Sequence, residues 1–278
     1  MILFNLIIFI FGTIIGSFLN VLIYRIPRGI GFVKGRSFCP KCKKQIKWFD
    51  NIPLFSFVIL GGKCRNCKKS ISLRYPLIEF ITGILTVLII NNQLSIIKQY
   101  SIINFQTFFD FGSSLLVVYG LVVIFFIDLE HFIIPDEIVF PLIGISLLNN
   151  LYRFRLASSA ARLAGMTGIN ILIATNILPA ILSFLFFYFL YLITKHKGMG
   201  FGDVKLAFLM GLLLGYPGIV LALYISFLTG AFFGVILILR KKAKAKSKVP
   251  FGPFLSGAAI IVFLWGEKIL LKVLQFLN

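Results

Sequence analysis

The chain has 278 residues, of which 59% are hydrophobic and 13% charged, and its mean hydropathy is +0.99. This composition excludes an ordinary soluble domain. The apolar residues form continuous runs long enough to cross about 30 Å of hydrocarbon as helices, without the alternation that a β-barrel requires. We therefore predict an all-α polytopic membrane protein with about eight transmembrane helices.

The expected spans are residues 1–23, 76–91, 112–127, 138–151, 170–193, 204–216, 218–239 and 254–276. The first lacks the basic start and the cleavage site of a signal peptide, so we expect a retained anchor. No internal repeat of fixed period is apparent.

The distribution of positive charge predicts the topology. When alternate loops are assigned to opposite sides, 22 of the 28 Lys and Arg residues fall on one side. The positive-inside rule places that side in the cytoplasm and both termini outside. Topology and attraction to anionic lipid then explain the net charge of +19, including the basic run 241–248, and no nucleic acid partner is expected.

The largest polar segment, residues 24–75, contains all four cysteines. They form two C-x-x-C pairs, Cys39/Cys42 and Cys64/Cys67, with 21 residues between the pairs. Such pairs can place four thiolates around one structural Zn²⁺, which suits a segment too short to build much of a core alone. Two disulfides or a redox role are the alternatives, and a reducing cytoplasm disfavours stable disulfides.

Four of the nine acidic residues lie between Asp128 and Glu137, where the third span ends and the fourth begins. A fifth, Asp203, ends the sequence Gly-x-Gly-x-Gly-Asp (198–203) at the start of the sixth span. Ionisable groups at the edge of apolar helices are costly and mark functional sites. We expect Asp128 and Asp203 to face each other, to share one proton and to activate water for attack on a peptide carbonyl.

A structural interpretation competes for two of these acids. Asp136 and Asp203 each precede an apolar helix, and Asp is a preferred N-cap. For Asp136 a capping or supporting role is favoured, whereas for Asp203 both interpretations stay open. Asp128 ends a helix, where the helix dipole disfavours a carboxylate, so a functional role is favoured.

Motifs along most of the chain resemble the type 4 prepilin peptidases, also called leader peptidase/N-methyltransferases, which are aspartic proteases of the GxGD type. The motifs are 16–27 (GSFLNVLIYRIP), 36–42 (RSFCPKC), 48–53 (WFDNIP), 64–67 (CRNC), 71–76 (ISLRYP) with Glu79, Asp128 with 134–136 (IPD), 200–206 (GFGDVKL) and 250–254 (PFGPF). Each is moderate support alone, and their order makes the resemblance specific.

The resemblance implies a bacterial inner-membrane enzyme with eight spans and a cytoplasmic active site. Such enzymes cleave the basic leader of prepilins and pseudopilins after a glycine. They then methylate the new N-terminal residue, usually Phe, with S-adenosylmethionine. The family's catalytic pair falls on Asp128 and Asp203, and its tetracysteine site falls on Cys39, Cys42, Cys64 and Cys67.

The resemblance also sets the expected regions: the first helix at 1–23, a cytoplasmic zinc-binding insert at 24–75 and a seven-helix catalytic domain at 76–278. The insert implies the form that has both activities. Methylation rests on the resemblance alone, with Glu79 as a candidate for the methyl donor site. The residues expected to support the dyad are Gly200, Gly202, Asp136, Lys205, Pro250, Gly252 and Pro253. The segment 250–254 positions the substrate backbone in this interpretation, or else is only the turn that starts the last helix.

Two other functions are compatible with the residues. A proton-coupled transporter would use Asp128 and Asp203 as relay groups. Both acids lie at one edge of the membrane and no inverted halves are apparent, which disfavours a transporter. A non-catalytic assembly scaffold carrying a zinc module is the second alternative, and it would tolerate Asn at both positions.

Overall fold

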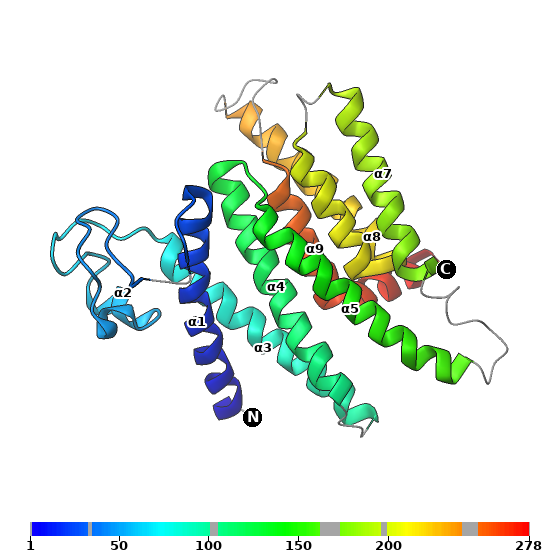
Figure 1. The fold of residues 1–278 in the computed structure, drawn as a ribbon, viewed down its shortest axis with the longest axis horizontal. Coiled ribbons are helices and arrows are strands. Elements are labelled where there is room, and N and C mark those ends of the chain that lie inside the picture. Colours follow the sequence, from blue (N-terminus) through cyan, green and yellow to red (C-terminus); the bar gives the residue numbers. More distant parts are fainter. Residues whose placement is uncertain are drawn as a thin grey trace. The chain divides into compact units, whose positions relative to one another are not determined.

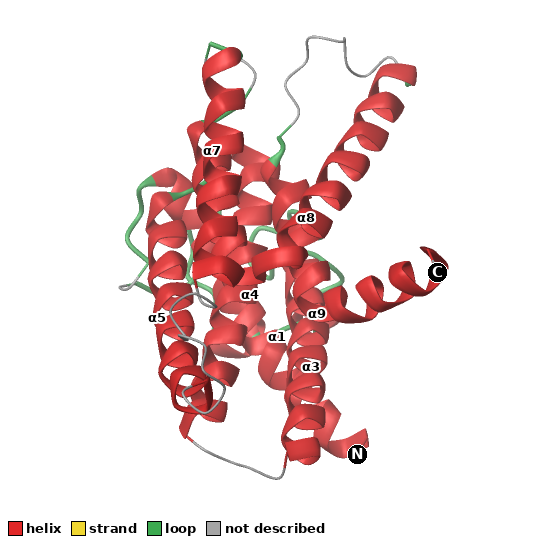
Figure 2. Cartoon of the chain, turned by 90° about the vertical axis from the view of Figure 1, so that its right-hand side faces the viewer, coloured by secondary structure: helices red, strands yellow, loops and turns green. Residues whose placement is uncertain are grey.

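The computed structural model describes residues 2–32, 35–100, 105–161, 173–195, 199–240 and 250–277. This part of the chain is helical, with two isolated β-bridges and no β-strand (Figure 1, Figure 2). The start of the fifth predicted span (170–172), Gly198 and the basic run 241–248 lie outside the described residues. The chain divides into two compact units, Met1–Asn104 and Phe105–Asn278.

The first unit consists of two long helices and the cysteine-containing insert between them. Its elements are α1 (Ile2–Arg25), η1 (Ile26–Arg28), η2 (Trp48–Asn51), α2 (Phe55–Ile59) and α3 (Arg74–Tyr100). Helices α1 and α3 pack closely because small residues line their contact. A Cβ atom on Gly16 of α1 would lie 2.7 Å from the Cα atom of Glu79 on α3. Small residues spaced like Gly12 and Gly16 are typical of close helix packing in membranes.

The second unit is a bundle of helices around one apolar core. Its elements are α4 (Phe105–His131), α5 (Asp136–Ala161), the π-helical turn η4 (Ile173–Ile177), α7 (Leu178–Ile193), α8 (Phe201–Leu239) and α9 (Gly252–Leu277). Core side chains come from all five long helices, for example Leu121, Leu142, Phe187, Leu209 and Leu255. Many Leu and Phe side chains also point outward, as expected where lipid surrounds the bundle.

Six helices in the described residues are long and apolar enough to cross a membrane: Ile2–Arg28, Arg74–Leu94, Phe109–His131, Thr175–Ile193, Phe201–Leu237 and Gly252–Val273. The backbone of α8 is non-helical at Gly215 and Tyr216, so α8 contains two helical segments, as the separate spans 204–216 and 218–239 predicted. Helix α5 corresponds to the remaining predicted span. The prediction of an all-α polytopic membrane protein is therefore confirmed.

Helix α5 continues ten residues beyond its predicted end at 151. The prediction stopped where the apolar run stops, just before Arg153. Arg, Leu and Ala are strong helix formers, so the helix continues after its hydrophobicity has fallen.

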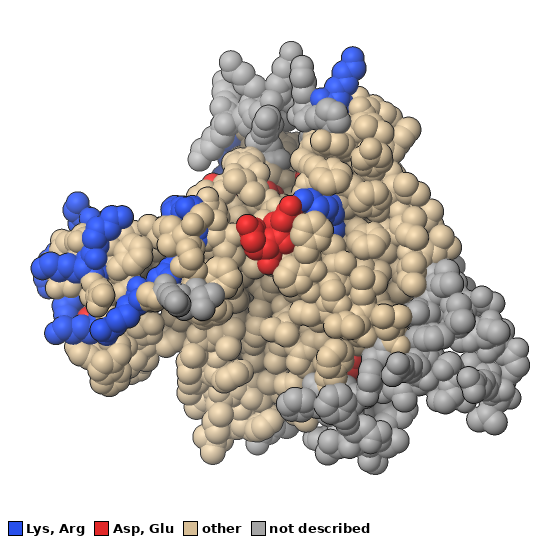
Figure 3. Space-filling model, viewed as in Figure 1, with Lys and Arg blue, Asp and Glu red and all other residues tan. Residues whose placement is uncertain are grey.

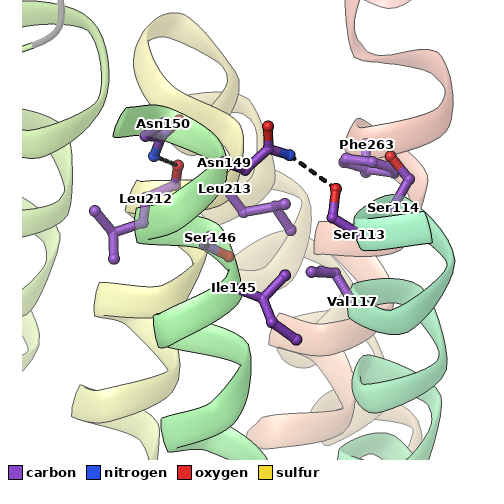
Figure 4. A pocket seen from close by; sticks show the side chains of 10 residues that line it. All are labelled: Ser113, Ser114, Val117, Ile145, Ser146, Asn149, Asn150, Leu212, Leu213 and Phe263. Atoms are coloured by element: carbon purple, nitrogen blue, oxygen red, sulfur yellow. Dashed lines mark hydrogen bonds between the residues drawn. The ribbon is translucent and has the colours of Figure 1, made fainter. Parts of the chain in front are cut away.

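The break in α8 is held by two side-chain amides from neighbouring elements. Pro217 has no amide hydrogen and the two preceding residues are non-helical, so the hydrogen bonds of the helix are interrupted here. The Leu212 carbonyl instead accepts hydrogen bonds from the side chains of Asn150 (2.9 Å) and Asn176 (3.2 Å). A cavity of about 40 Å³ lies beside this point, between α4, α5, α8 and α9 (Figure 4).

Replacing Asn150 with leucine should destabilise the second unit by about 1–2 kcal/mol, because the buried Leu212 carbonyl then loses one of its two side-chain donors. Thermal unfolding in detergent would measure the loss. Leu151→Ala, at a neighbouring side chain that is 52% exposed, is the control and should change stability by less than about 0.5 kcal/mol. Equal unfolding temperatures for Asn150→Leu and the unmodified chain would contradict this role.

Candidate active site

Asp128 lies in the last turn of α4 and is only 5% exposed. The helix ends three residues later because Phe132 adopts a left-handed conformation, with φ of 59°. The Phe132 amide donates to the Asp128 carbonyl oxygen at 2.9 Å, which closes the last turn. The carboxylate is thus buried at the end of a helix whose dipole disfavours it, so helix stability does not explain its presence.

Asp203 is the third residue of α8 and is 8% exposed. Its Oδ2 accepts a hydrogen bond from the Gly200 amide at 3.2 Å, and its own amide donates to the Gly200 carbonyl at 3.1 Å. The first of these bonds is one half of a capping box, in which the carboxylate of the third helical residue accepts from the N-cap amide, and the second bond is an ordinary backbone turn. Capping uses one carboxylate oxygen of Asp203, which leaves the other oxygen available for chemistry.

Three further residues bring the two carboxylates together. The backbone amide of Gly252, the first residue of α9, donates a hydrogen bond to Asp128. A Cβ atom on Gly252 would lie 2.6 Å from Asp128 Oδ2, and one on Gly202 would lie 2.8 Å from the Cβ atom of Ile134. Ile134 therefore fills the space between the starts of α8 and α9. In this arrangement Asp128 and Asp203 interact electrostatically with each other.

Asp136 and Lys205, both predicted to support the dyad, form an ion pair between the first turns of α5 and α8. The Lys205 ammonium also lies over the rings of Phe140 (5.5 Å) and Phe201 (5.3 Å). The pair therefore fixes the start of α8, which carries Asp203, against the start of α5.

The segment Pro250–Phe254 holds the Gly252 amide in place through aromatic contacts. The Phe251 ring lies 5.2 Å from that of Phe227 and 6.3 Å from that of Phe187. The Ser226 hydroxyl donates to the Phe254 carbonyl at 3.2 Å. Pro253 follows as the second residue of α9, where the lack of an amide hydrogen costs nothing.

Replacing Gly252 with alanine should lower the activity of the site, because the new methyl group would displace the Asp128 carboxylate. A displacement of about 1 Å costs on the order of 100-fold in rate when the group takes part in the chemistry. Gly257→Ala, one and a half turns further along α9, is the matched control, since its nearest neighbour would be a Phe125 ring atom at an ordinary 3.6 Å. Equal turnover by the two alanine variants would contradict the placement of Gly252.

The four cysteines form a second cluster, in the first unit. Their sulphur atoms all lie within 4.8 Å of one another, and none is in a disulfide. Four sulphurs bound tetrahedrally to Zn²⁺ would be about 3.8 Å apart, so the set fits a four-coordinate metal site.

Two matching hairpins carry the cysteines. The Cys39 amide donates to the Lys44 carbonyl and the Cys64 amide to the Lys69 carbonyl, both at 2.9 Å. Left-handed residues follow both pairs, at Lys43 (φ 61°) and Lys68 (φ 57°). Each hairpin also has one β-bridge, between Phe38 and Gln45 in the first and between Lys63 and Ser70 in the second. Each position in the second hairpin lies 25 residues after the corresponding position in the first.

Sequence reasoning did not find this local duplication of the two cysteine hairpins. The signal is present in the sequence as Cys-x-x-Cys-Lys-Lys-x-Ile, at residues 39–46 and again at 64–71. Comparing the flanks of the two cysteine pairs would have found it.

An ion pair ties the second hairpin to η2. Arg65 binds Asp50 through two nitrogens, at 2.7 Å and 2.9 Å. The hydrogen bonds from Arg65 hold the pKa of the Asp50 carboxyl below its ordinary value. The Arg65 guanidinium also lies 5.4 Å from the centre of the Phe49 ring. The insert is thus held by side-chain contacts in addition to the cysteine cluster.

Glu79, the candidate for the methyl donor site, is 8% exposed and lies in the second turn of α3. Its Oε2 accepts a hydrogen bond from the Leu54 amide at 2.8 Å, and the carboxylate is also hydrogen-bonded to the Ser17 side chain. Glu79 therefore joins α1, α3 and the start of α2.

Comparison with known proteins identifies the family. The bacterial peptidase A24 N-terminal domain matches residues 10–92, and the type IV leader peptidase family matches residues 115–235. The prepilin leader peptidase/N-methyltransferase of Pseudomonas aeruginosa is 31% identical over 95% of this chain and 91% of its own. This chain belongs to the type IV leader peptidase family. Proteins of the same name from Stutzerimonas stutzeri (32% identical, 96% of this chain and 92% of the relative) and Legionella pneumophila (30%, 95% and 92%) match similarly. No solved structure matches the chain.

Each of the two matched regions of this leader peptidase contains one of the two groups of candidate site residues. The four cysteines and Glu79 lie in the N-terminal match, and Asp128 and Asp203 lie in the peptidase match. The apolar helices and the family together make the chain a multi-pass inner-membrane protein.

Proposed function

We propose that this chain is a prepilin leader peptidase and N-methyltransferase that uses Asp128 and Asp203 as its catalytic pair. Its substrates are prepilins and pseudopilins, whose basic leader is removed after a glycine. The observation that carries the proposal is the pair of buried carboxylates, supplied by α4 and α8, at the end of the bundle where Ile134 contacts both Gly202 and Gly252.

The chemistry follows from the charge of the pair. Two adjacent buried carboxylates repel each other when both are ionised, so the pair retains one proton. The ionised member takes a proton from a water molecule as the water attacks the scissile carbonyl. The protonated member donates a hydrogen bond to the carbonyl oxygen, where negative charge develops. The Gly252 and Gly200 amides hold the two carboxylates in position for these steps.

Acidic side chains beside the dyad favour a basic leader. Glu130 and Glu137 are exposed on either side of the loop that joins α4 and α5, next to Asp136. Figure 3, which has the same view as Figure 1, shows a group of acidic side chains at one place on the surface. Their negative charge attracts a positively charged substrate segment to the site. The positive-inside rule places this end of the bundle in the cytoplasm and both termini outside.

A transition-state analogue tests the reaction class. A prepilin peptide with a hydroxyethylene group in place of the scissile amide resembles the tetrahedral intermediate of direct water attack. It should bind the purified enzyme in detergent at least about 100-fold more tightly than the uncleaved peptide does. A matched peptide with a reduced methylene-amine at a bond outside the cleavage site is the control. Equal affinities for the hydroxyethylene peptide and the uncleaved peptide would contradict aspartic catalysis.

The insert supplies the structural zinc site, in which Cys39, Cys42, Cys64 and Cys67 are the ligands. S-adenosylmethionine supplies the methyl group for the new N-terminal amine. In this proposal the Glu79 carboxylate, beside the Ser17 hydroxyl, holds the amino group or ribose hydroxyls of the donor, which are groups that a carboxylate binds well.

Glu79→Gln should lower methylation by at least about 10-fold while leader cleavage continues, because the amide lacks the charge that holds the donor. Methylated and unmethylated pilin can be separated by mass after one reaction. Donor binding, followed by equilibrium dialysis of labelled S-adenosylmethionine, should weaken in parallel. Normal donor binding together with loss of zinc would instead show that Glu79 only anchors the insert.

A further inference from the structure

The insert exposes a group of large apolar side chains that the proposed chemistry does not use. Trp48 is 77% exposed, and Phe55, Val58 and Ile59 of α2 are 66%, 76% and 68% exposed. Ile52, between them in the chain, is 45% exposed. These five side chains, called here the apolar face of the insert, come from only twelve consecutive residues, and water is an unfavourable neighbour for such a patch.

The hydrogen bond between Leu54 and Glu79 fixes the depth of this face relative to α3. Leu54 directly precedes α2, and Glu79 lies five residues after Arg74, where α3 begins. At about 1.5 Å per residue, the Glu79 backbone lies about 7 Å inward from Arg74, so α2 begins beside the first two turns of α3.

The same Glu79 also locates this point along helix α1. The Glu79 backbone packs on Gly16, and Gly16 lies nine residues before Arg25, where α1 ends. This corresponds to about 13 Å of helix. Both helices therefore place the start of α2 beside their apolar portions, where the surrounding medium is lipid.

Basic side chains border the apolar face on the side of Phe49, whose ring lies 5.7 Å from that of Trp48. The Lys47 ammonium lies 5.6 Å from the centre of the Phe49 ring, and the Arg65 guanidinium lies 5.4 Å from the same ring. Lys and Arg side chains gather over the insert (Figure 3). Apolar side chains bordered by Lys, Arg and Trp are typical of segments that lie in the interface of an anionic membrane. A basic substrate segment, by contrast, is repelled by this charge.

We propose that the apolar face of the insert is buried in the bilayer, in the leaflet at which α1 ends and α3 begins. The side chains of Trp48, Phe55 and Val58 contact the upper acyl chains, and the bordering Lys and Arg side chains contact anionic headgroups. The insert is thus a membrane-anchored element and does not extend freely into water.

Tryptophan fluorescence tests the proposal directly, because the chain has only two tryptophans, Trp48 and Trp265. Trp265→Phe leaves Trp48 as the single emitter in the full-length protein. The protein is placed in nanodiscs of phosphatidylcholine and phosphatidylglycerol, with acyl chains brominated near the headgroup or left unbrominated. Bromine quenches tryptophan only near contact. We expect brominated lipid to reduce the Trp48 emission at least about two-fold and aqueous iodide to quench it little.

A second pair of variants compares two sites of the insert in a background without native tryptophan. Val58→Trp, on the apolar face, should be quenched by brominated lipid. Lys69→Trp, in the second cysteine hairpin, should be quenched by iodide. Equal quenching of the two by brominated lipid would overturn the assignment of the apolar face. Quenching of Trp48 by iodide alone, or by neither agent because protein covers it, would overturn the proposal as a whole.

Discussion

The single variants Asp128→Asn and Asp203→Asn should each lower the rate of leader cleavage by about 10³-fold or more. Asparagine keeps the shape of the side chain, and its amide can neither take a proton from water nor share one with its neighbour. Initial rates of purified enzyme in detergent, with a prepilin substrate in excess, would measure the loss.

The double variant distinguishes a dyad from two independent residues. If the two carboxylates act as one unit, Asp128→Asn/Asp203→Asn should be no slower than either single variant. Asp110→Asn, on α4 some five turns before Asp128, is the matched control and should cleave at nearly the normal rate. Losses that multiply in the double variant would contradict a shared mechanism.

Replacing Cys39 or Cys64 with serine should abolish stable zinc binding, from about one ion per chain to nearly none, because a structural site requires all four thiolates. The two variants should behave alike, since Cys39 and Cys64 occupy equivalent positions in the duplicated hairpins. Metal analysis of the purified protein measures this.

The insert should also become sensitive to protease in both serine variants, since a short segment with little core depends on its metal. Asn66→Ser, between Cys64 and Cys67, changes an exposed side chain of the same hairpin and should keep full zinc. Normal zinc content in Cys39→Ser or Cys64→Ser would show that the cysteines are not the ligands.

Much of the fold could be predicted because lipid restricts the choices. A backbone in hydrocarbon must satisfy its own hydrogen bonds, so each long apolar run becomes a helix, and the Pro-Gly pair after Tyr216 marks the break in α8. The end of α5 could not be predicted in this way, because Arg153 ends the apolar run but does not end a helix.

The candidate site, like the fold, could be predicted from the sequence only in part. Asp128 and Asp203 could be chosen from sequence because carboxylates are rare and costly at the edge of apolar helices. The Gly252 amide on Asp128 and the position of Ile134 between two glycines depend on how α8 and α9 pack, and no local pattern carries that information. Asp203 was expected either to cap or to catalyse, and its geometry shows that capping occupies only one oxygen.

The most direct test of the aspartic dyad is the intact mass of a prepilin co-expressed with the wild-type enzyme, with Asp128→Asn or with Asp203→Asn. We predict that wild type yields pilin without its leader and with one added methyl group. Both variants, present in the membrane at normal levels and with normal zinc, should leave the prepilin uncut. Complete leader removal by either variant would show that these carboxylates only support the helices and that another group performs the cleavage.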